Sequence, residues 1–164
     1  KNFLLDNQAI QNQDSIVNFC EKIKAGKQAQ ITTDFMIIAT VGNLILEKSL
    51  DDAIERTLAY VEAGADGIMV HSRSKTKDEI FQYCKQYEKL NINVPLVAVT
   101  STYNEVYEDE LIEMGVKVVI YANHLLRAAY PSMVEVAKGI LKNGRAAEIE
   151  KECMDIKEIL HLIP

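Results

Sequence analysis

AGADGIMVHS, residues 63–72, indicates the fold of this chain more clearly than any other stretch. Gly64 ends a helical pattern, a short apolar run follows it, and His71 and Ser72 come directly after that run. Short apolar runs between turn signals are typical of parallel strands buried on both faces. Polar groups at the carboxyl ends of such strands are where α/β folds place their chemistry. The stretch therefore predicts an α/β fold with a candidate site at His71.

The same pattern of a glycine, an apolar run and polar residues recurs at Gly115, where a second apolar run leads to Asn123 and His124. Periodicity and caps predict helices over about 14–29, 51–64, 77–90, 105–114, 125–143 and 146–162, and strands over 35–41, 67–71, 96–100 and 117–122. Two architectures fit this alternation: an open doubly wound sheet, or part of a (β/α)8 barrel. No GxGxxG or P-loop pattern follows any strand, which disfavours nucleotide binding.

Composition narrows the functional classes. The net charge of −6 and the lack of a basic stripe argue against nucleic-acid binding. No apolar run approaches the roughly 20 residues of a membrane span, so we expect no membrane partner. Three separated cysteines without a CxxC pair favour reduced thiols in a cytoplasmic protein over disulfides or a zinc site. We expect a single domain over residues 1–164.

Five segments resemble the phosphoenolpyruvate mutase family, which belongs to the phosphoenolpyruvate mutase/isocitrate lyase superfamily. They are FMIIATV at 35–41, AGADGIMVHS at 63–72, VPLVAVTSTYNE at 94–105, MGVKVVIYANHLLRAAYP at 114–131 and IKEILHLIP at 156–164. The resemblance runs nearly end to end. It implies a (β/α)8 barrel of TIM type, of which this chain supplies about four βα units from the carboxyl-terminal part.

The resemblance also implies an activity. Members of the family interconvert phosphoenolpyruvate and phosphonopyruvate, an isomerase reaction that forms the carbon–phosphorus bond in phosphonate biosynthesis and depends on Mg²⁺. The family's Mg²⁺-binding carboxylates have no counterpart here, so no metal ligand is assigned. A terminal helix, expected over 145–164, implies a homo-oligomer that exchanges this helix between subunits. Two alternatives stay open: a catalytically inactive or truncated homologue, and a phosphonopyruvate hydrolase or lyase of the same superfamily.

By resemblance, Lys1 and Asn2 belong to a gating loop over residues 1–13 that closes on the substrate and excludes water. His71 is assigned to the substrate anion, and Asn123 to substrate binding, although asparagine is also a natural helix N-cap. Phe3 stands where bacterial members have serine.

Thr40 departs most from the family pattern. The family strand end reads Ala-Arg-Val-Glu, and its arginine grips the anionic substrate, whereas here it reads Ala39-Thr40-Val41-Gly42. A threonine cannot replace the charge or the paired hydrogen bonds of a guanidinium. Thr100 and Ser101 stand where the family has Pro-Thr. Because these changes gather at substrate-facing strand ends, we expect altered or lost activity.

Other chemistry-bearing residues have structural interpretations. Cys20 and Cys84 lie on apolar helix faces, which favours a place in the core. The Asp51-Asp52 pair suits a helix N-terminus better than a metal site. His124 at a helix start is expected to be structural, and His161 is assigned no role.

Overall fold

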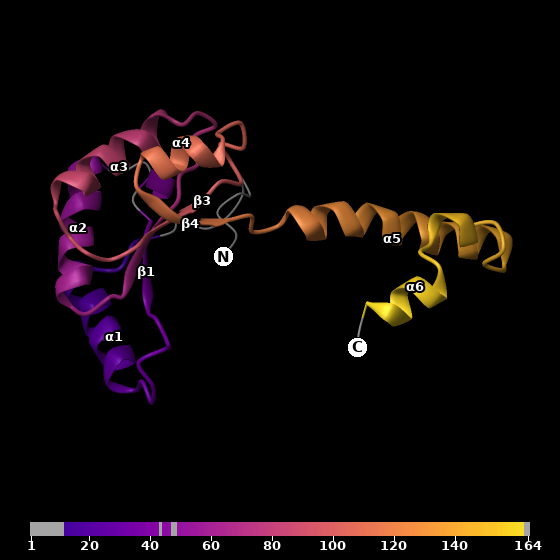
Figure 1. Ribbon diagram of the computed structural model, residues 1–164, viewed down its shortest axis with the longest axis horizontal. Coiled ribbons are helices and arrows are strands. Elements are labelled where there is room, and N and C mark those ends of the chain that lie inside the picture. Colours follow the sequence, from indigo (N-terminus) through magenta and orange to yellow (C-terminus); the bar gives the residue numbers. More distant parts are fainter. Residues whose placement is uncertain (1–11, 43, 47–48, 163–164) are drawn as a thin grey trace. The chain divides into compact units, whose positions relative to one another are not determined.

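The computed structural model describes residues 12–42, 44–46 and 49–162, which fall into two compact units, 1–122 and 123–164. The first unit contains the following elements, most of which Figure 1 labels: α1 (Ile16–Gln28), β1 (Ile38–Val41), a 3₁₀ helix η1 (Leu44–Leu46), α2 (Leu50–Glu62), β2 (Gly67–Val70), α3 (Asp78–Lys89), β3 (Leu96–Val99), α4 (Glu108–Glu113) and β4 (Val116–Ile120). The alternation of helices and strands predicted from the sequence is confirmed.

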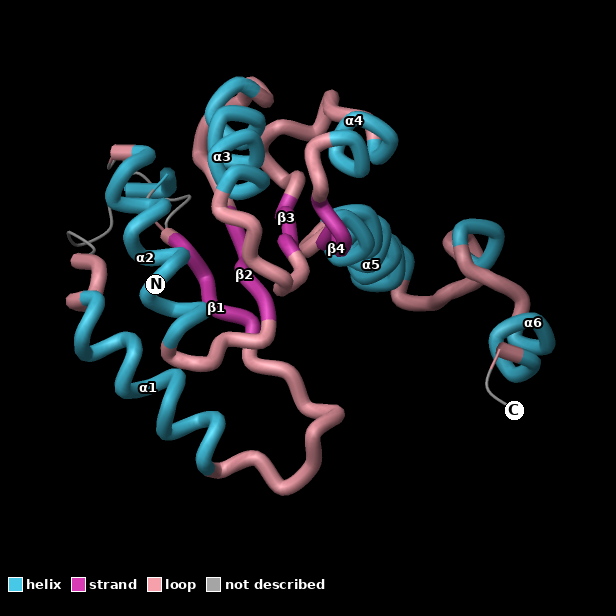
Figure 2. Tube along the Cα trace, turned by 60° about the vertical axis from the view of Figure 1, so that its left-hand side comes forward, coloured by secondary structure: helices cyan, strands magenta, loops and turns pink. Residues whose placement is uncertain are grey.

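The four strands form one parallel sheet in the order β1-β2-β3-β4, so each strand pairs with its neighbour in sequence. Right-handed crossovers that all advance in one direction place their helices on one face of a sheet. Figure 2 shows α2, α3 and α4 following the outer side of the curved sheet. A doubly wound sheet has helices on both faces. The chain therefore has the arrangement of a (β/α)8 barrel segment, which the family resemblance implied and the alternation of elements left open beside a doubly wound sheet.

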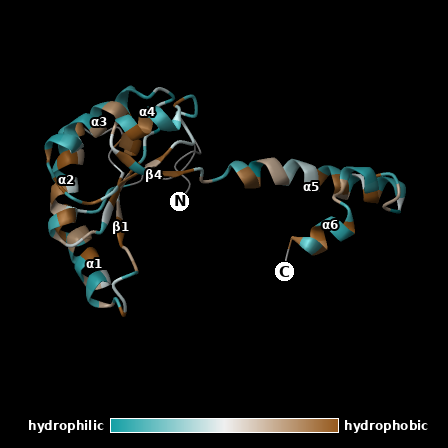
Figure 3. Ribbon diagram, in the orientation of Figure 1, coloured by the Kyte–Doolittle hydropathy of each residue, from teal (hydrophilic) through white to brown (hydrophobic). Residues whose placement is uncertain are grey.

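The core lies between this sheet and its helices. Val41, Val70 and Ala98 occupy one row of the sheet and are fully buried. Ile80 and Tyr83 of α3 are also fully buried in this core. β4 is exposed to solvent on the face that points away from the helices, where Val118 and Ile120 are 46% and 36% exposed. Figure 3 shows the apolar character of this strand.

Local chemistry sets the helix starts. The Ser15 hydroxyl accepts a hydrogen bond from the Asn18 amide, and Ser49 does the same for Asp52, which gives α1 and α2 side-chain N-caps. Gly64, with φ of 103°, follows α2 in a conformation that favours glycine. The strands are shorter than predicted; β1 begins at Ile38 rather than 35, because Phe35 and Met36 lie exposed outside the sheet.

Arg56 joins α1 to α2 and is only 6% exposed. Its Nε lies 3.2 Å from an Asp52 carboxylate oxygen, and its Nη1 donates to the Asp14 carbonyl at 2.9 Å and to the Tyr60 hydroxyl at 3.1 Å. A buried charge is tolerated because each of these contacts replaces hydration. Phe19 packs on the Tyr60 ring with centroids 4.5 Å apart. These contacts fix the two helices against each other.

The second unit contains α5 (His124–Asn143), the 3₁₀ helix η2 (Glu150–Glu152) and α6 (Ile156–His161). α5 continues through Pro131 and is capped by Gly144, whose φ is 66°. The continuous helix predicted over 146–162, within the terminal helix assigned to 145–164, is wrong. Cys153 is extended, and the Asp155 carboxylate accepts from the Lys157 amide at 2.7 Å, which starts a new helix. None of the residues of α5 or α6 is buried.

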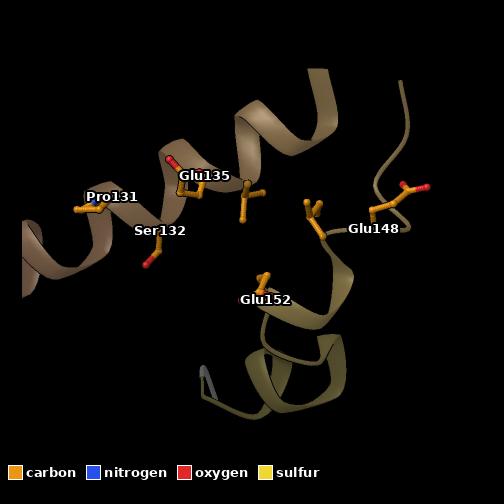
Figure 4. A pocket seen from close by; sticks show the side chains of 7 residues that line it. Pro131, Ser132, Glu135, Glu148 and Glu152 are labelled. Carbon is orange, nitrogen blue, oxygen red and sulfur yellow. The ribbon is translucent and has the colours of Figure 1, made fainter. Parts of the chain in front are cut away.

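A pocket of about 530 Å³ lies within the second unit, between α5 and the η2 segment. Figure 4 shows Pro131, Ser132 and Glu135 on one side and Glu148 and Glu152 on the other. Its three carboxylates pair with Lys138, Arg145 and Lys151, so the pocket shows no excess of positive charge for an anionic substrate. In the described part of the chain, no helix combines the length and the apolar character needed to cross a membrane.

Candidate functional site

Thr40 and His71 lie on the face of the sheet opposite the helices. Thr40 pairs in register with Met69, and both are half-buried, whereas the next row, Val41 and Val70, is fully buried against the helices. Side chains alternate between the two faces of a strand, so His71, directly after Val70, lies on the same face as Thr40. Parallel strands end at one edge of the sheet. The structure thus brings together the two candidates that the sequence placed at neighbouring strand ends.

His71 is half-buried, and burial lowers the pKa of its imidazole below the ordinary value. The pKa falls because a protonated ring loses hydration when it leaves water. At neutral pH the ring is therefore neutral, with one nitrogen donating and the other accepting a hydrogen bond. His71 can bind a substrate oxygen by a hydrogen bond, but it does not supply a positive charge at pH 7.

Two hydroxyls at the end of β3 were noted in the sequence only as departures from a family pattern. Thr100 is 2% exposed, and neither its hydroxyl nor the buried Ser101 hydroxyl has a hydrogen-bond partner among the residues that the structure describes. By alternation from the fully buried Ala98, Thr100 lies on the helix side and Ser101 on the face of Thr40 and His71. Ser101 is therefore a site candidate that residue type alone did not identify, since serine is common in turns.

The edge of the sheet is poor in positive charge. Gly42, His71, Ser72, Thr100 and Ser101 are the residues that follow the first three strands, and none is a lysine or arginine. Arg73 is the next cation after β2 and is exposed. A Cβ built on Gly42 would meet no described atom within 4 Å. The position could therefore accept a larger side chain without a clash at its Cβ.

The other predicted site residues are not brought to this edge by anything the structure describes. Lys1 and Asn2, with the rest of residues 1–11, lie outside the described residues. Asn123 is at the N-cap position of α5, but its side chain makes no capping hydrogen bond, so the interpretation as a side-chain cap is wrong. Its Oδ1 atom is buried without a partner among the described residues. His124 is the first residue of α5.

Mg²⁺ has no candidate ligand set among residues 12–42, 44–46 and 49–162, because no group of three or more His, Cys, Asp or Glu side chains there could hold a metal ion. Asp51 and Asp52 lie in the first turn of α2, as expected from the helix dipole. Mg²⁺ prefers several oxygen ligands in octahedral geometry. The described residues therefore offer no cluster of three or more protein ligands for this metal.

A pocket of about 320 Å³ lies between the loop after β2 and the loop after β3. Lys75, Thr76 and Lys77 line it from the first loop, and Tyr103 and Glu105 from the second. The Lys77 ammonium is paired with the Glu110 carboxylate. Positive and negative groups are mixed here, so this pocket shows no preference for an anion.

Comparison with known proteins places this geometry in a family. Residues 5–141 match the family model described as phosphoenolpyruvate phosphomutase. A phosphonopyruvate hydrolase from Variovorax sp. (strain Pal2) is 38% identical over 148 residues, which cover 90% of this chain and 50% of that protein. The chain spans about half the length of the curated relatives it matches.

Solved structures agree with the fold. The crystal structure of phosphoenolpyruvate phosphomutase from Streptomyces platensis subsp. rosaceus superimposes with a TM-score of 0.87 at 34% identity, covering 98% of this chain and 54% of that one. A phosphonopyruvate hydrolase in complex with oxalate and Mg²⁺ gives a TM-score of 0.83 at 36% identity, covering 96% of this chain and 55% of that one. Each of these chains is about twice as long as the part it shares with this one.

Proposed function

Because the chain belongs to the phosphoenolpyruvate phosphomutase family, we propose that it forms the carboxyl-terminal half of a barrel that acts on phosphoenolpyruvate and phosphonopyruvate. The proposed reaction is their interconversion, with a weakened hold on the anionic substrate. His71 at the carboxyl edge, on the same face as Thr40, is the observation that supports this proposal. The family implies Mg²⁺, which would neutralise substrate charge when bound, and the described residues contain no cluster of three or more possible ligands for it.

In the proposed mechanism, this chain binds and orients the substrate. The neutral His71 ring donates one hydrogen bond to a substrate oxygen, because burial lowers its pKa. The Thr40 hydroxyl supplies a second, uncharged contact on the same face. A neutral donor stabilises an anion less than a guanidinium does, since it supplies neither a positive charge nor paired hydrogen bonds. The expected result is weak binding and slow turnover. By analogy with the family's gating loop, Lys1 and Asn2 would close over the substrate.

A phosphorus NMR experiment tests the proposal. Phosphonopyruvate is titrated into the wild-type chain, into His71→Gln and into the double variant Thr40→Arg with Gly42→Glu, with Mg²⁺ present. We expect His71→Gln to weaken binding about tenfold and the double variant to tighten it by a similar factor, consistent with one charged hydrogen bond. The open space at Gly42 makes the double variant feasible. Unchanged affinity in both variants would show that these strand ends do not face the substrate.

Phosphonopyruvate hydrolysis is the second candidate, favoured by the 38% identity to a phosphonopyruvate hydrolase. The same spectra separate the two reactions. A mutase converts phosphonopyruvate into phosphoenolpyruvate, whereas a hydrolase releases inorganic phosphate and pyruvate. Because Thr40 supplies no positive charge, we expect the signal of phosphoenolpyruvate or of inorganic phosphate to grow slowly in the wild-type chain. A signal that grows quickly would contradict weak substrate binding.

We further propose a homo-oligomer and a cytoplasmic location. The support for an oligomer is that Leu125 and Leu141 of α5 are 87% and 84% exposed, and that Leu160 and Leu162 near the carboxyl terminus are about two thirds exposed. Large exposed apolar residues in such number mark an interaction surface. Light scattering at micromolar concentration tests this; a stable monomer would contradict the oligomer.

The three free cysteines support the proposed cytoplasmic location, because thiols stay reduced there.

A further inference from the structure

Ser72, the residue after His71, is the most firmly held polar residue at the carboxyl edge. It is fully buried. Its hydroxyl donates to the Glu79 carboxylate and accepts a hydrogen bond from the Ser74 amide at 2.9 Å. Its carbonyl accepts from the Thr102 hydroxyl at 2.6 Å. Two other segments, the start of α3 and the loop after β3, therefore converge on one serine.

These partners come from different parts of the fold. Glu79 lies in the first turn of α3, where a carboxylate is stabilised by the helix dipole. Thr102 lies in the loop between β3 and α4, so its bond to the Ser72 carbonyl joins that loop to the one after β2. Both bonds are partly buried, and leaving a buried polar group without its partner is costly. The network of Ser72, Glu79 and Thr102 thus restrains the backbone at the point where His71 leaves the sheet.

We propose that Thr102 and Glu79 are positioning residues for His71, acting through Ser72. The inference rests on the proposed role of His71 in binding the substrate anion. Because Ser72 cannot turn or shift while its hydroxyl and its carbonyl are both held, the preceding peptide and the direction of the His71 side chain are held as well. Removal of the Thr102 hydroxyl frees the Ser72 carbonyl and lets water reach the loop. His71 then becomes more hydrated and less well oriented.

The test follows the titration of the His71 ring by imidazole NMR in the full chain, with His71→Gln used to assign its signal among the three histidines. Thr102→Val removes the donor while keeping the shape of the side chain. We expect the His71 midpoint to rise toward the ordinary value of about 6.5, by roughly half a pH unit. Thr102→Ser, which retains the hydroxyl, is expected to keep the wild-type midpoint.

Thr57→Val is the matched control. Thr57 is a fully buried threonine, whereas Thr102 is half-buried. The Thr57 hydroxyl donates to the Ala53 carbonyl at 2.8 Å and lies 2.6 Å from the Tyr83 hydroxyl, which joins α2 to α3. We expect this variant to lower the thermal midpoint without moving the His71 titration. A general loss of stability would move both variants alike, and that result would overturn the proposal. An unmoved His71 signal in Thr102→Val would also overturn it.

Glu79→Ala provides the second measurement if Thr102→Val does not fold. It removes the acceptor of the Ser72 hydroxyl, and we expect it to move the His71 midpoint in the same direction. An unmoved midpoint would overturn the proposal. The outcome is separable from the proposed function. If the His71 titration moves but His71→Gln binds phosphonopyruvate as tightly as wild type, the function is wrong and the positioning stands. If His71→Gln weakens phosphonopyruvate binding but the His71 titration does not move in the Thr102 and Glu79 variants, the function stands and the positioning is wrong.

Discussion

Lys27 and Asp66 join the end of α1 to the start of β2: the Lys27 Nζ lies 2.8 and 2.9 Å from the two carboxylate oxygens of Asp66. One of those oxygens also accepts a hydrogen bond from the Ile37 amide at 2.8 Å, just before β1. Each side chain of the ion pair is about 30% exposed. Three segments distant in sequence therefore meet at a single carboxylate on the amino-terminal side of the sheet.

Asp66→Asn should lower the free energy of unfolding by about 1–2 kcal/mol, since it removes a partly buried ion pair but leaves an acceptor for Ile37. The backbone hydrogen bond and the Lys27 ammonium lower the pKa of Asp66. A lowered folded-state pKa gives stability that is present above the unfolded pKa of about 3.9 and is lost as the pH falls through the folded value. Urea unfolding at several pH values measures this.

The wild type and Asp66→Asn should therefore differ most at neutral pH and converge in acid. Asp34→Asn, at an exposed position, serves as the control and should change little. A difference between wild type and Asp66→Asn that grows below pH 4 would contradict the assignment.

Tyr83→Phe should lower the free energy of unfolding by about 1 kcal/mol, because it removes the bond between the Tyr83 and Thr57 hydroxyls in the core. Thr57 keeps its bond to the Ala53 carbonyl, so no hydroxyl is left without a partner. Thermal and urea unfolding measure the change. Tyr130→Phe, on an exposed residue of α5, should be neutral. Equal effects of the two variants would show that the buried pair adds nothing.

Cys84 should resist alkylation in the native chain. Burial raises the pKa of its thiol to about 12, so the reactive thiolate is scarce at pH 8. Cys153 is exposed and should react first with iodoacetamide, as followed by mass spectrometry of tryptic peptides. Urea should remove the protection. Modification of Cys84 at the rate of Cys153 in native buffer would mean that α3 opens readily.

Gly67→Ala should destabilise the chain by about 1–3 kcal/mol through overpacking. A Cβ at this position would lie 2.6 Å from Ile38 Cδ1 and 3.1 Å from the Pro95 carbonyl oxygen. Ile38→Val deletes the first of these atoms, so the double variant should lose less stability than the sum of the two single variants. Gly42→Ala, where the added atom meets no described neighbour, is the control. Simple additivity in urea unfolding would contradict this close contact.

Sequence patterns predicted most of the first unit because its signals are local. Apolar runs marked the four strands, and Ser15 caps α1 near the start of the helix predicted over 14–29. The errors have physical causes. Phe35 is apolar but lies outside β1, since strand ends depend on pairing rather than on residue type. The helix expected over 146–162 is interrupted because Asp155 caps a new helix, a competing local signal within the predicted span.

The candidate site was only partly predictable. His71 was found because it follows a buried strand, and the structure places it on the face of Thr40. The bond from Thr102 to Ser72 joins residues thirty positions apart and depends on how two loops pack, which no local pattern reports. The buried hydroxyl of Ser101 was likewise invisible, since burial of a turn residue is set by the tertiary fold.

The sequential strand order also has a kinetic consequence. Each parallel pair closes over a single intervening α-helix, and each of the four described strands pairs with its neighbour in sequence. Folding rates rise as contacts become more local, because less loop entropy is lost before a pair forms. During synthesis, β1 and β2 can pair as soon as β2 has left the ribosome, and β3 and β4 can then add in turn. The strands can therefore join the sheet in the order in which they are synthesised.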